Sequence, residues 1–342
     1  MAWLIALCGL VVLVYGYTAW MLLSGAVGWF RRRGRPARAK AAGRRPMVWL
    51  VLRGTTLTLA AAGAVCIVNA WFIEPYWAEV THFEIRSDKL PANDRPVRIV
   101  HISDTHCDGD RARLENELPG IIRQTAPDLI VWTGDAANDP SGHERFRGLM
   151  RQLSAIAPTY AVRGNWDSGS PELFSGTGVI VVGEIDGRPF DVEIRGARLC
   201  IAGGAWNQWR YTIQSLQLAD PTRYIVFLNH LPDAILWVDK AVVREKDPAH
   251  KPDMFLAGHT HGGQVRLPFF GAVVTRQKTG RLFENGMVEY NGTMVHVSRG
   301  IGMNGNGPRV RFLCRPEVAV IDLYSSKGDG EIVPSGSREA SH

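Results

Sequence analysis

Seven side chains of the types that bind metal ions lie in five short motifs of this 342-residue chain, which read DTH, GD, GNWD, NH and GHTHGG. The candidate ligands are two aspartates, one asparagine and four histidines: Asp104, His106, Asp135, Asn165, His230, His259 and His261. Imidazole nitrogens combined with carboxylate and amide oxygens suit Mn, Zn or Fe better than Ca. Because seven ligands are too many for one ion, the set predicts two divalent ions that share one carboxylate.

Such a centre has a definite chemistry. Two divalent ions carry more positive charge than two aspartates neutralise, so the centre would attract an anionic phosphoryl group. Paired ions also lower the pKa of bound water and stabilise the attacking and leaving oxygens of an in-line displacement. The residue types therefore predict hydrolysis of a phosphoric ester or anhydride.

Each motif follows a short apolar run that is typical of a buried strand. The five predicted strands are Val97–Ser103, Leu129–Thr133, Thr159–Arg163, Tyr224–Leu228 and Met254–Ala257. Helical stretches are predicted over 111–124 and 143–156, and after residue 170 further short strands indicate a β-rich half that forms a second sheet. Strand–helix alternation predicts an α/β domain, whose functional groups gather at the carboxyl ends of the strands.

The ordered motifs resemble the calcineurin-like metallophosphoesterase superfamily, whose pattern is DxH, GD, GNH[DE], a lone H and GHxH. The resemblance covers roughly residues 97–323, and the segment Val297–Leu323 together with the N-terminal part is similar to a membrane-associated bacterial branch. That branch includes enzymes similar to UDP-2,3-diacylglucosamine pyrophosphatases and broad phosphodiesterases. The implied fold is a four-layer sandwich of two mixed sheets flanked by helices.

The resemblance also implies a role for each ligand. Asp104, His106 and His261 would hold the first metal, Asp135 would bridge, and Asn165, His230 and His259 would hold the second. Asp135, Asn165 and His230 are predicted to be catalytic on the same basis.

One position departs from the family pattern, because Trp166 stands where the family usually has a histidine. A tryptophan cannot act as a general acid. Either the leaving group needs no protonation, as for a phosphate leaving from an anhydride, or another group, such as Asp167 or a metal-bound water, supplies the proton. Trp166, Asp167 and Arg299 are the candidate substrate contacts.

The charge of the chain is unevenly distributed. Lys and Arg number 39 and Asp and Glu 33, a net charge of +6, which at first indicates an anionic partner. However, residues 31–45 contain eight basic and no acidic residues, so residues 1–74 contribute +8 and the remainder −2. A nearly neutral large domain offers no basic patch for nucleic acid, and no nucleic-acid partner is expected.

The basic segment lies between two uncharged runs, Leu4–Leu23 and Gly54–Ile73, each of about the length that spans a bilayer. The predicted domains are transmembrane helix 1 (1–30), a basic cytoplasmic loop (31–46), transmembrane helix 2 (47–77), a metallophosphoesterase domain (78–324) and a disordered tail (325–342). Short basic loops stay in the cytoplasm. We therefore expect a multi-pass inner-membrane protein with an extracytoplasmic catalytic domain; the alternative is a cleaved signal peptide followed by a buried core helix.

The leading hypothesis is a membrane-anchored, dinuclear metal-dependent phosphoesterase that cleaves a phosphodiester or pyrophosphate bond. Its expected partners are the phospholipid bilayer and a phosphorylated small molecule or lipid, including a lipid-linked or nucleotide-activated substrate. The alternatives are a tethered nucleotide phosphodiesterase of broad specificity and a metal-binding scaffold whose catalysis has decayed.

Overall fold

The structure is a computed structural model that describes residues 14–24, 27, 47–109, 113–184, 186–245, 248–275, 279–305 and 309–327. The chain divides into two compact units, Met1–Ala70 and Trp71–His342. The basic loop over 31–46 and residues 328–342 of the predicted tail lie outside the described residues, as does most of the first predicted span.

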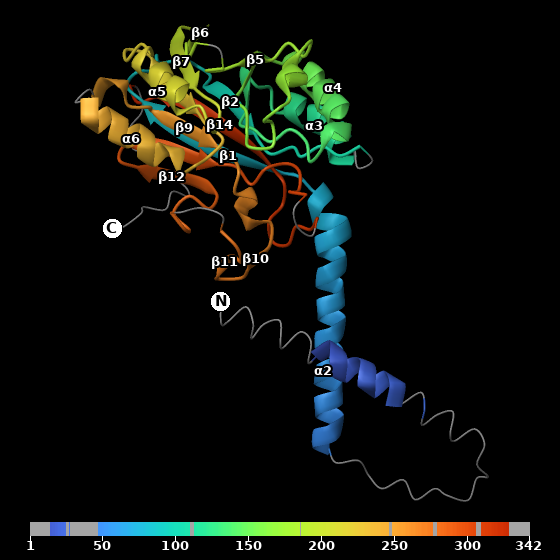
Figure 1. The fold of residues 1–342 in the computed structure, drawn as a ribbon. Coiled ribbons are helices and arrows are strands. Elements are labelled where there is room, and N and C mark those ends of the chain that lie inside the picture. Colours follow the sequence, from blue (N-terminus) through green and yellow to red (C-terminus); the bar gives the residue numbers. More distant parts are fainter. Residues whose placement is uncertain are drawn as a thin grey trace, which may run out of the picture. The chain divides into compact units, whose positions relative to one another are not determined.

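The larger unit contains two six-stranded mixed sheets (Figure 1). In spatial order, the first sheet consists of β1 (Glu79–Ser87), β14 (Glu317–Ser325), β2 (Val97–Ile102), β3 (Leu129–Trp132), β4 (Thr159–Ala161) and β5 (Ile180–Val181). The second consists of β12 (Gly286–Tyr290), β13 (Thr293–Val297), β9 (Met254–Ala257), β8 (Tyr224–Leu228), β7 (Ala197–Gly203) and β6 (Phe190–Ile194). Strands β2, β3 and β4 run parallel, as do β7, β8 and β9, so their carboxyl ends share one edge in each sheet.

Helices cover the outer face of each sheet. The helices are α3 (Arg113–Gln124) and α4 (His143–Ser154) on the first sheet, and α5 (Trp209–Gln217) and α6 (Ala234–Glu245) on the second. A two-stranded hairpin, β10 (Arg266–Leu267) and β11 (Gly271–Ala272), projects from the body of this unit (Figure 1). Short helical turns occur at Asn69–Ile73, Glu74–Tyr76, Pro140–Gly142, Pro171–Phe174, Pro248–His250 and His261–Gly263.

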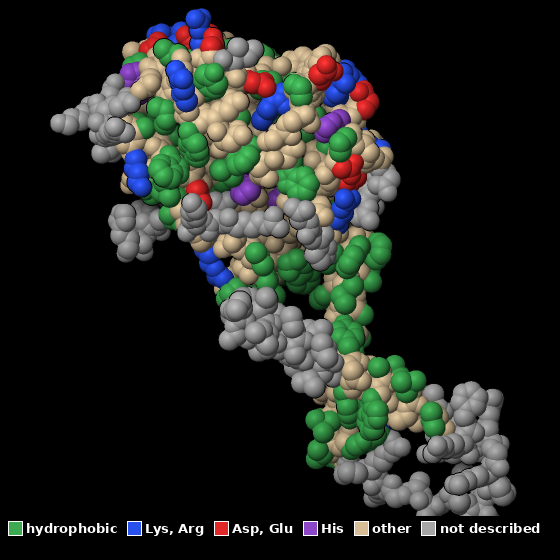
Figure 2. All heavy atoms as spheres, viewed as in Figure 1, with side chains coloured by type: hydrophobic (Ala, Val, Ile, Leu, Met, Phe, Trp, Pro, Cys, Tyr) green, Lys and Arg blue, Asp and Glu red, His purple; other side chains and the backbone are tan. Residues whose placement is uncertain are grey.

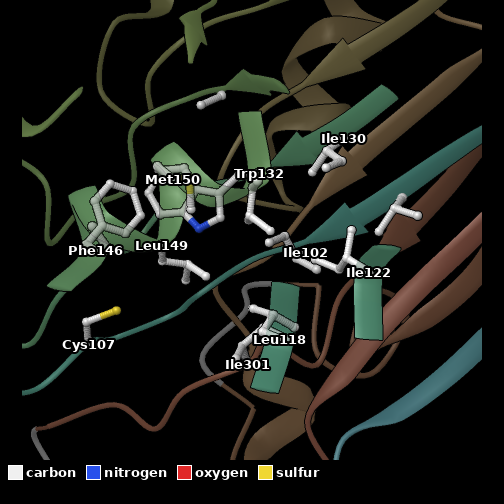
Figure 3. Packing of buried hydrophobic residues seen from close by; sticks show 14 of the residues in the cluster. Ile102, Cys107, Leu118, Ile122, Ile130, Trp132, Phe146, Leu149, Met150 and Ile301 are labelled. Carbon is white, nitrogen blue, oxygen red and sulfur yellow. The ribbon is translucent and has the colours of Figure 1, made fainter. Parts of the chain in front are cut away.

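The central strands are apolar on both faces because each sheet is covered on both sides. Along β3, Leu129 and Val131 enter the core between the sheets, whereas Ile130 and Trp132 face the helices. This alternation follows from the two-residue period of a strand. In Figure 3 Phe146, Leu149 and Met150 of α4 lie around Trp132, whose ring centroid lies 4.9 Å from that of Phe146. The layers are therefore helix, sheet, sheet and helix, which confirms the two mixed sheets flanked by helices.

In the smaller unit, α2 (Met47–Val68) is apolar and largely exposed. Hydrophobic side chains gather along it in Figure 2. Among the described residues one helix, Met47–Tyr76, is long and apolar enough to cross a membrane, with 11% of its most apolar window buried. The low burial distinguishes this helix from the core helix of the signal-peptide alternative. Of the first predicted span, residues 14–24 are helical and the remainder is mostly undescribed.

The predicted β-rich second half supplies most of the second sheet, but two of its strands, β5 and β14, belong to the first sheet. The prediction also missed the helices α5 and α6 that cover the second sheet. The edge strand β1, which pairs in parallel with β14, was also missed.

Candidate metal centre

The five motifs lie in the loops that follow β2, β3, β4, β8 and β9. These are the carboxyl ends of neighbouring parallel strands in two facing sheets. The structure therefore brings all seven predicted ligands to one place, although they are spread over 158 residues of sequence from Asp104 to His261.

One group of potential ligand atoms comes from Asp104, His106 and His261, all of which are buried. His106 Nε2 lies 3.1 Å from His261 Nε2, and His261 Nε2 lies 3.3 Å from Asp104 Oδ1. Ligands about 2.1 Å from a metal are separated from one another by about 3.0–3.4 Å. The donor atoms therefore have the spacing and the N and O chemistry that a divalent transition metal requires.

A second group comes from Asp135, His230 and His259, with Asn165 beside them. Asn165 Oδ1 lies 3.0 Å from His230 Nε2 and 3.0 Å from His259 Nδ1, and these two nitrogens are 3.1 Å apart. The amide oxygen thus completes a second set with the same spacing.

Asp135 lies between the two groups. Its Oδ2 is 3.3 Å from His230 Nε2 in the second group and 3.5 Å from His106 Nε2 in the first. The backbone N–H of Trp166 donates to the other oxygen, Oδ1, at 2.9 Å. A carboxylate in this position is close enough to both groups to bind the ion that each would hold, which supports the assignment of Asp135 as the bridge.

Five of the seven ligand residues have a left-handed backbone conformation. Their φ angles are Asp104 49°, His106 40°, Asp135 63°, His259 71° and His261 53°. This conformation is uncommon outside glycine and costs on the order of 1–3 kcal/mol per residue. Because five such residues lie at one site, we infer that the loop conformations orient the ligand side chains at the expense of local backbone strain.

Glycine makes the close approach of these loops possible. A Cβ at Gly258 would clash with Ser103 Oγ and Asp104 Oδ2, and a Cβ at Gly164 would clash with Asp135 Oδ1. The glycines of the GN and GHTH motifs are therefore required by packing against the ligands themselves.

Burial and mutual charge perturb the ionisation of the ligands. Burial lowers the pKa of His106 to about 4 and also lowers that of His261. Burial would likewise lower the pKa of His230, but the charge of Asp135 outweighs it and raises this pKa to about 9. Burial raises the pKa of Asp104, whereas His230 overcomes burial to lower that of Asp135. Bound cations would relieve this crowding by keeping the carboxylates ionised and the imidazoles neutral.

Two further polar residues hold the ligand loops in position. Asp167 accepts hydrogen bonds from the backbone N–H groups of Gly164, Asp135 and Ala136 at 2.6, 3.0 and 2.8 Å. Asn138 donates to the carbonyl oxygen of His106 at 3.1 Å. Both of the Asp167 oxygens are engaged, so we assign this residue to loop support instead of the substrate contact suggested by the sequence.

The other two predicted substrate contacts have different positions. The Trp166 ring packs edge-on against His106, with centroids 5.5 Å apart, so it lies beside the first group of ligands. Arg299, by contrast, lies 2.9 Å from Glu79 Oε2 and 3.4 Å from Glu317 Oε1. Two carboxylates thus hold the Arg299 guanidinium, which argues against a phosphate-binding role.

Arg311 is a supporting residue that no sequence motif indicated. It is fully buried and donates to the carbonyl oxygens of Cys314, Arg299, Gly300 and Gly302. In the same loop, Ile301 and Gly302 donate to the backbone oxygens of Ser103 and Asp104 at 2.9 and 2.7 Å. Arg311 therefore fixes a loop that lies directly against the first ligand motif.

A four-layer sandwich with paired His and Asp clusters at its strand ends defines a class of metal-dependent hydrolases. The family model described as calcineurin-like phosphoesterase matches residues 97–263. YkuE of Bacillus subtilis, described as an uncharacterized metallophosphoesterase, is 32% identical over 78% of this chain and 94% of its own length. The chain belongs to the calcineurin-like phosphoesterase family and is a metal-dependent phosphoric ester or anhydride hydrolase.

Two more distant relatives have names that state an activity. The phosphodiesterase YaeI of Escherichia coli is 25% identical over 80% of this chain and 97% of its own length. The UDP-2,3-diacylglucosamine pyrophosphatase LpxG of Chlamydia muridarum is 23% identical over 79% of this chain and 98% of its own length.

Proposed function

We propose that this protein is a membrane-anchored dinuclear phosphoesterase that hydrolyses a phosphodiester or pyrophosphate bond in a lipid-linked or nucleotide-activated substrate. The observation that carries the proposal is the position of Asp135, whose Oδ2 lies within 3.5 Å of histidine nitrogens from both ligand groups. Two sites joined by one carboxylate are suited to two ions that act together on one phosphoryl group.

The seven ligand residues would hold the two ions in two sets. Asp104, His106 and His261 would hold one ion and Asn165, His230 and His259 the other, with Asp135 shared. When bound, the ions would supply Lewis-acid activation and the positive charge that stabilises the transition state. His230 Nδ1 donates to the carbonyl oxygen of Thr133 at 2.7 Å, which leaves Nε2 free to act as the ligand atom.

Two observations support a lipid-linked or nucleotide-activated substrate. The chain carries a candidate membrane span that ends at Tyr76, immediately before the catalytic unit's first strand. In addition, LpxG bears the name of a pyrophosphatase that acts on a nucleotide-activated lipid. An anchored site would meet such substrates at the bilayer surface.

A second candidate is a tethered phosphodiesterase for water-soluble nucleotides. A cavity of about 340 Å³ adjoins the GNWD motif and is lined by residues that include Arg163, Ser168 and Trp206. An indole face and a polar wall could hold a base and a sugar, and YaeI bears the name of a phosphodiesterase. This candidate predicts equal activity with and without bilayers.

The test uses the full chain in lipid nanodiscs, stripped with a chelator and reloaded with Mn or Zn. We expect two ions per chain by mass spectrometry, and hydrolysis that the chelator abolishes. Asp135→Asn should reduce turnover by more than about 100-fold. Mutation of residues that only support metal ligands already lowers metal affinity or activity by about 10- to 100-fold. Asp186→Asn, at an exposed aspartate that is not one of the seven ligands, is the matched control.

Undiminished turnover in Asp135→Asn, or one tightly bound ion in the wild type, would contradict the dinuclear proposal. A substrate panel separates the two candidates. Faster hydrolysis of a lipid-linked pyrophosphate than of a soluble nucleotide diester favours the first, and the reverse favours the second.

A further inference from the structure

An exposed apolar surface lies beside the β10–β11 hairpin. It consists of Phe269, Leu282 and Leu313, which we call the apolar rim. Phe269 is fully exposed, Leu313 is 49% exposed and Leu282 is 37% exposed. All three line one cavity of about 500 Å³. Large apolar side chains grouped around an open cavity indicate a surface that meets an apolar partner.

The backbone presents two of these side chains at an energetic cost. Phe269 has φ 62° and Leu313 has φ 51°, a left-handed conformation that bulky residues rarely adopt. Glycine or asparagine would occupy these positions with less strain. Since exposure of Phe269 and Leu313 to water brings no compensating burial, the strain points to a function for the rim.

The rim is joined to the end of the candidate membrane span by the segment that follows Leu313. The backbone N–H of Cys314 donates to the carboxylate of Glu74, within the last turn of the span. The guanidinium of Arg315 lies 4.1 Å from the ring centre of Trp77 and donates to the backbone oxygen of this residue at 3.0 Å. Trp77, which is exposed and directly follows the span, is of the residue type enriched at membrane interfaces.

The rim is also joined to the metal centre. Arg266, the first residue of β10, donates to the carbonyl oxygen of Gly262 at 3.1 Å, and Gly262 follows the ligand His261. The cavity wall also carries a basic group, because Arg281 lies 4.0 Å from the ring centre of Phe270. Arginine next to an apolar surface suits the boundary between phosphate headgroups and acyl chains.

We infer that the apolar rim inserts into the phospholipid leaflet in which the candidate span ends, so that the metal centre opens toward that leaflet. The inference rests on the proposed membrane anchoring and extends it, because a lipid substrate could then reach the metals without leaving the bilayer. A phospholipid leaflet is the favoured occupant because the rim is tied, through Cys314 and Arg315, to the residues at the end of the span.

The test places a fluorescent label on the rim of the full chain in phosphatidylcholine–phosphatidylglycerol liposomes. Cys8 and Cys66 are replaced by alanine, and the other three cysteines are buried. Single labels are attached to Phe269→Cys and Leu313→Cys, and to Leu218→Cys as the matched control, because Leu218 is an exposed leucine at the end of α5. Quenching is measured with nitroxide-bearing lipids and with iodide in the water.

We expect the labels at positions 269 and 313 to be quenched by nitroxide lipids and protected from iodide, and the label at 218 to show the reverse. Rim labels that respond like the control would overturn the inference. Self-quenching that grows with protein density would assign the rim to a second copy of the chain, and protection from both quenchers would assign it to another protein surface; either result also overturns it. The readout does not require hydrolysis, so a chain that docks but does not turn over substrate would contradict only the proposed function.

Discussion

We propose that the indole of Trp166 limits this site to leaving groups that need no protonation. The Trp166 ring lies against His106. The family pattern has a histidine at position 166, and an indole, unlike an imidazole, cannot act as a general acid. The wild type should therefore hydrolyse phosphoanhydrides faster than aryl diesters, and aryl diesters faster than alkyl monoesters. Fastest turnover of an alkyl monoester would refute this order.

The corresponding variant is Trp166→His. An imidazole at this position should raise the hydrolysis of alkyl esters by about 100-fold, at the lower end of the gain from general acid catalysis, and change anhydride hydrolysis little. Steady-state kinetics with matched substrates measure the effect. Trp209→His, at a partly exposed tryptophan of α5, controls for the loss of an indole; an equal gain in both variants would contradict the assignment.

His230 couples metal binding to proton release. Burial would lower the pKa of its imidazole, but Asp135 raises it to about 9, so most of the metal-free protein carries this proton at pH 8. A metal ligand must be neutral imidazole. Binding of Mn or Zn at pH 8 should therefore release about one proton from His230 and weaken as the pH falls. Calorimetry in buffers of different ionisation enthalpy measures this release, and a zero proton count at pH 8 would contradict it.

At the scale of the element, the strands that carry the ligands could be predicted from the sequence. The edge strand β1 and the residues that hold the ligand loops in position could not. The five ligand strands are continuous apolar runs because they are buried on both faces, and each is followed by a polar motif, so both signals are local in sequence. Strand β1 alternates polar and apolar residues at a sheet edge, which is a weaker signal. The roles of Asp167 and Arg299 depend on partners such as Ala136 and Glu79, which only the tertiary structure brings near.

Arg311 is the clearest example of a residue whose role depends on tertiary contacts, and its loss should affect a whole loop. Arg311→Met would leave four carbonyl groups of residues 299–314 without this donor, which we expect to lower the free energy of unfolding by about 2–4 kcal/mol. Because the loop contacts the backbone of Asp104, metal affinity should fall as well. Denaturant unfolding and metal titration measure the two effects.

Two further variants distinguish a role of Arg311 in positioning the metal ligands from a general loss of stability. Arg311→Lys should recover part of the metal affinity, since one ammonium can still donate to some of the carbonyl groups. Arg210→Met, at an exposed arginine of α5, should change neither stability nor affinity. Normal metal affinity in Arg311→Met would show that the loop does not position the ligands.

For the whole molecule, the side of the membrane on which the domain lies decides which substrates it can meet. Residues 31–45 carry eight basic and no acidic side chains, which predicts a cytoplasmic loop and an extracytoplasmic catalytic domain. A nucleotide-activated lipid made in the cytoplasm would not reach such a site, so an extracytoplasmic domain favours the lipid-linked member of the proposed substrate class. We therefore expect Asp186→Cys in the domain, with Cys8 and Cys66 replaced, to react with an impermeant maleimide in intact spheroplasts. Ala42→Cys in the loop should react only after lysis. The opposite labelling pattern would place the metals on the cytoplasmic side, where the pyrophosphatase substrate becomes accessible and the charge rule fails for this chain.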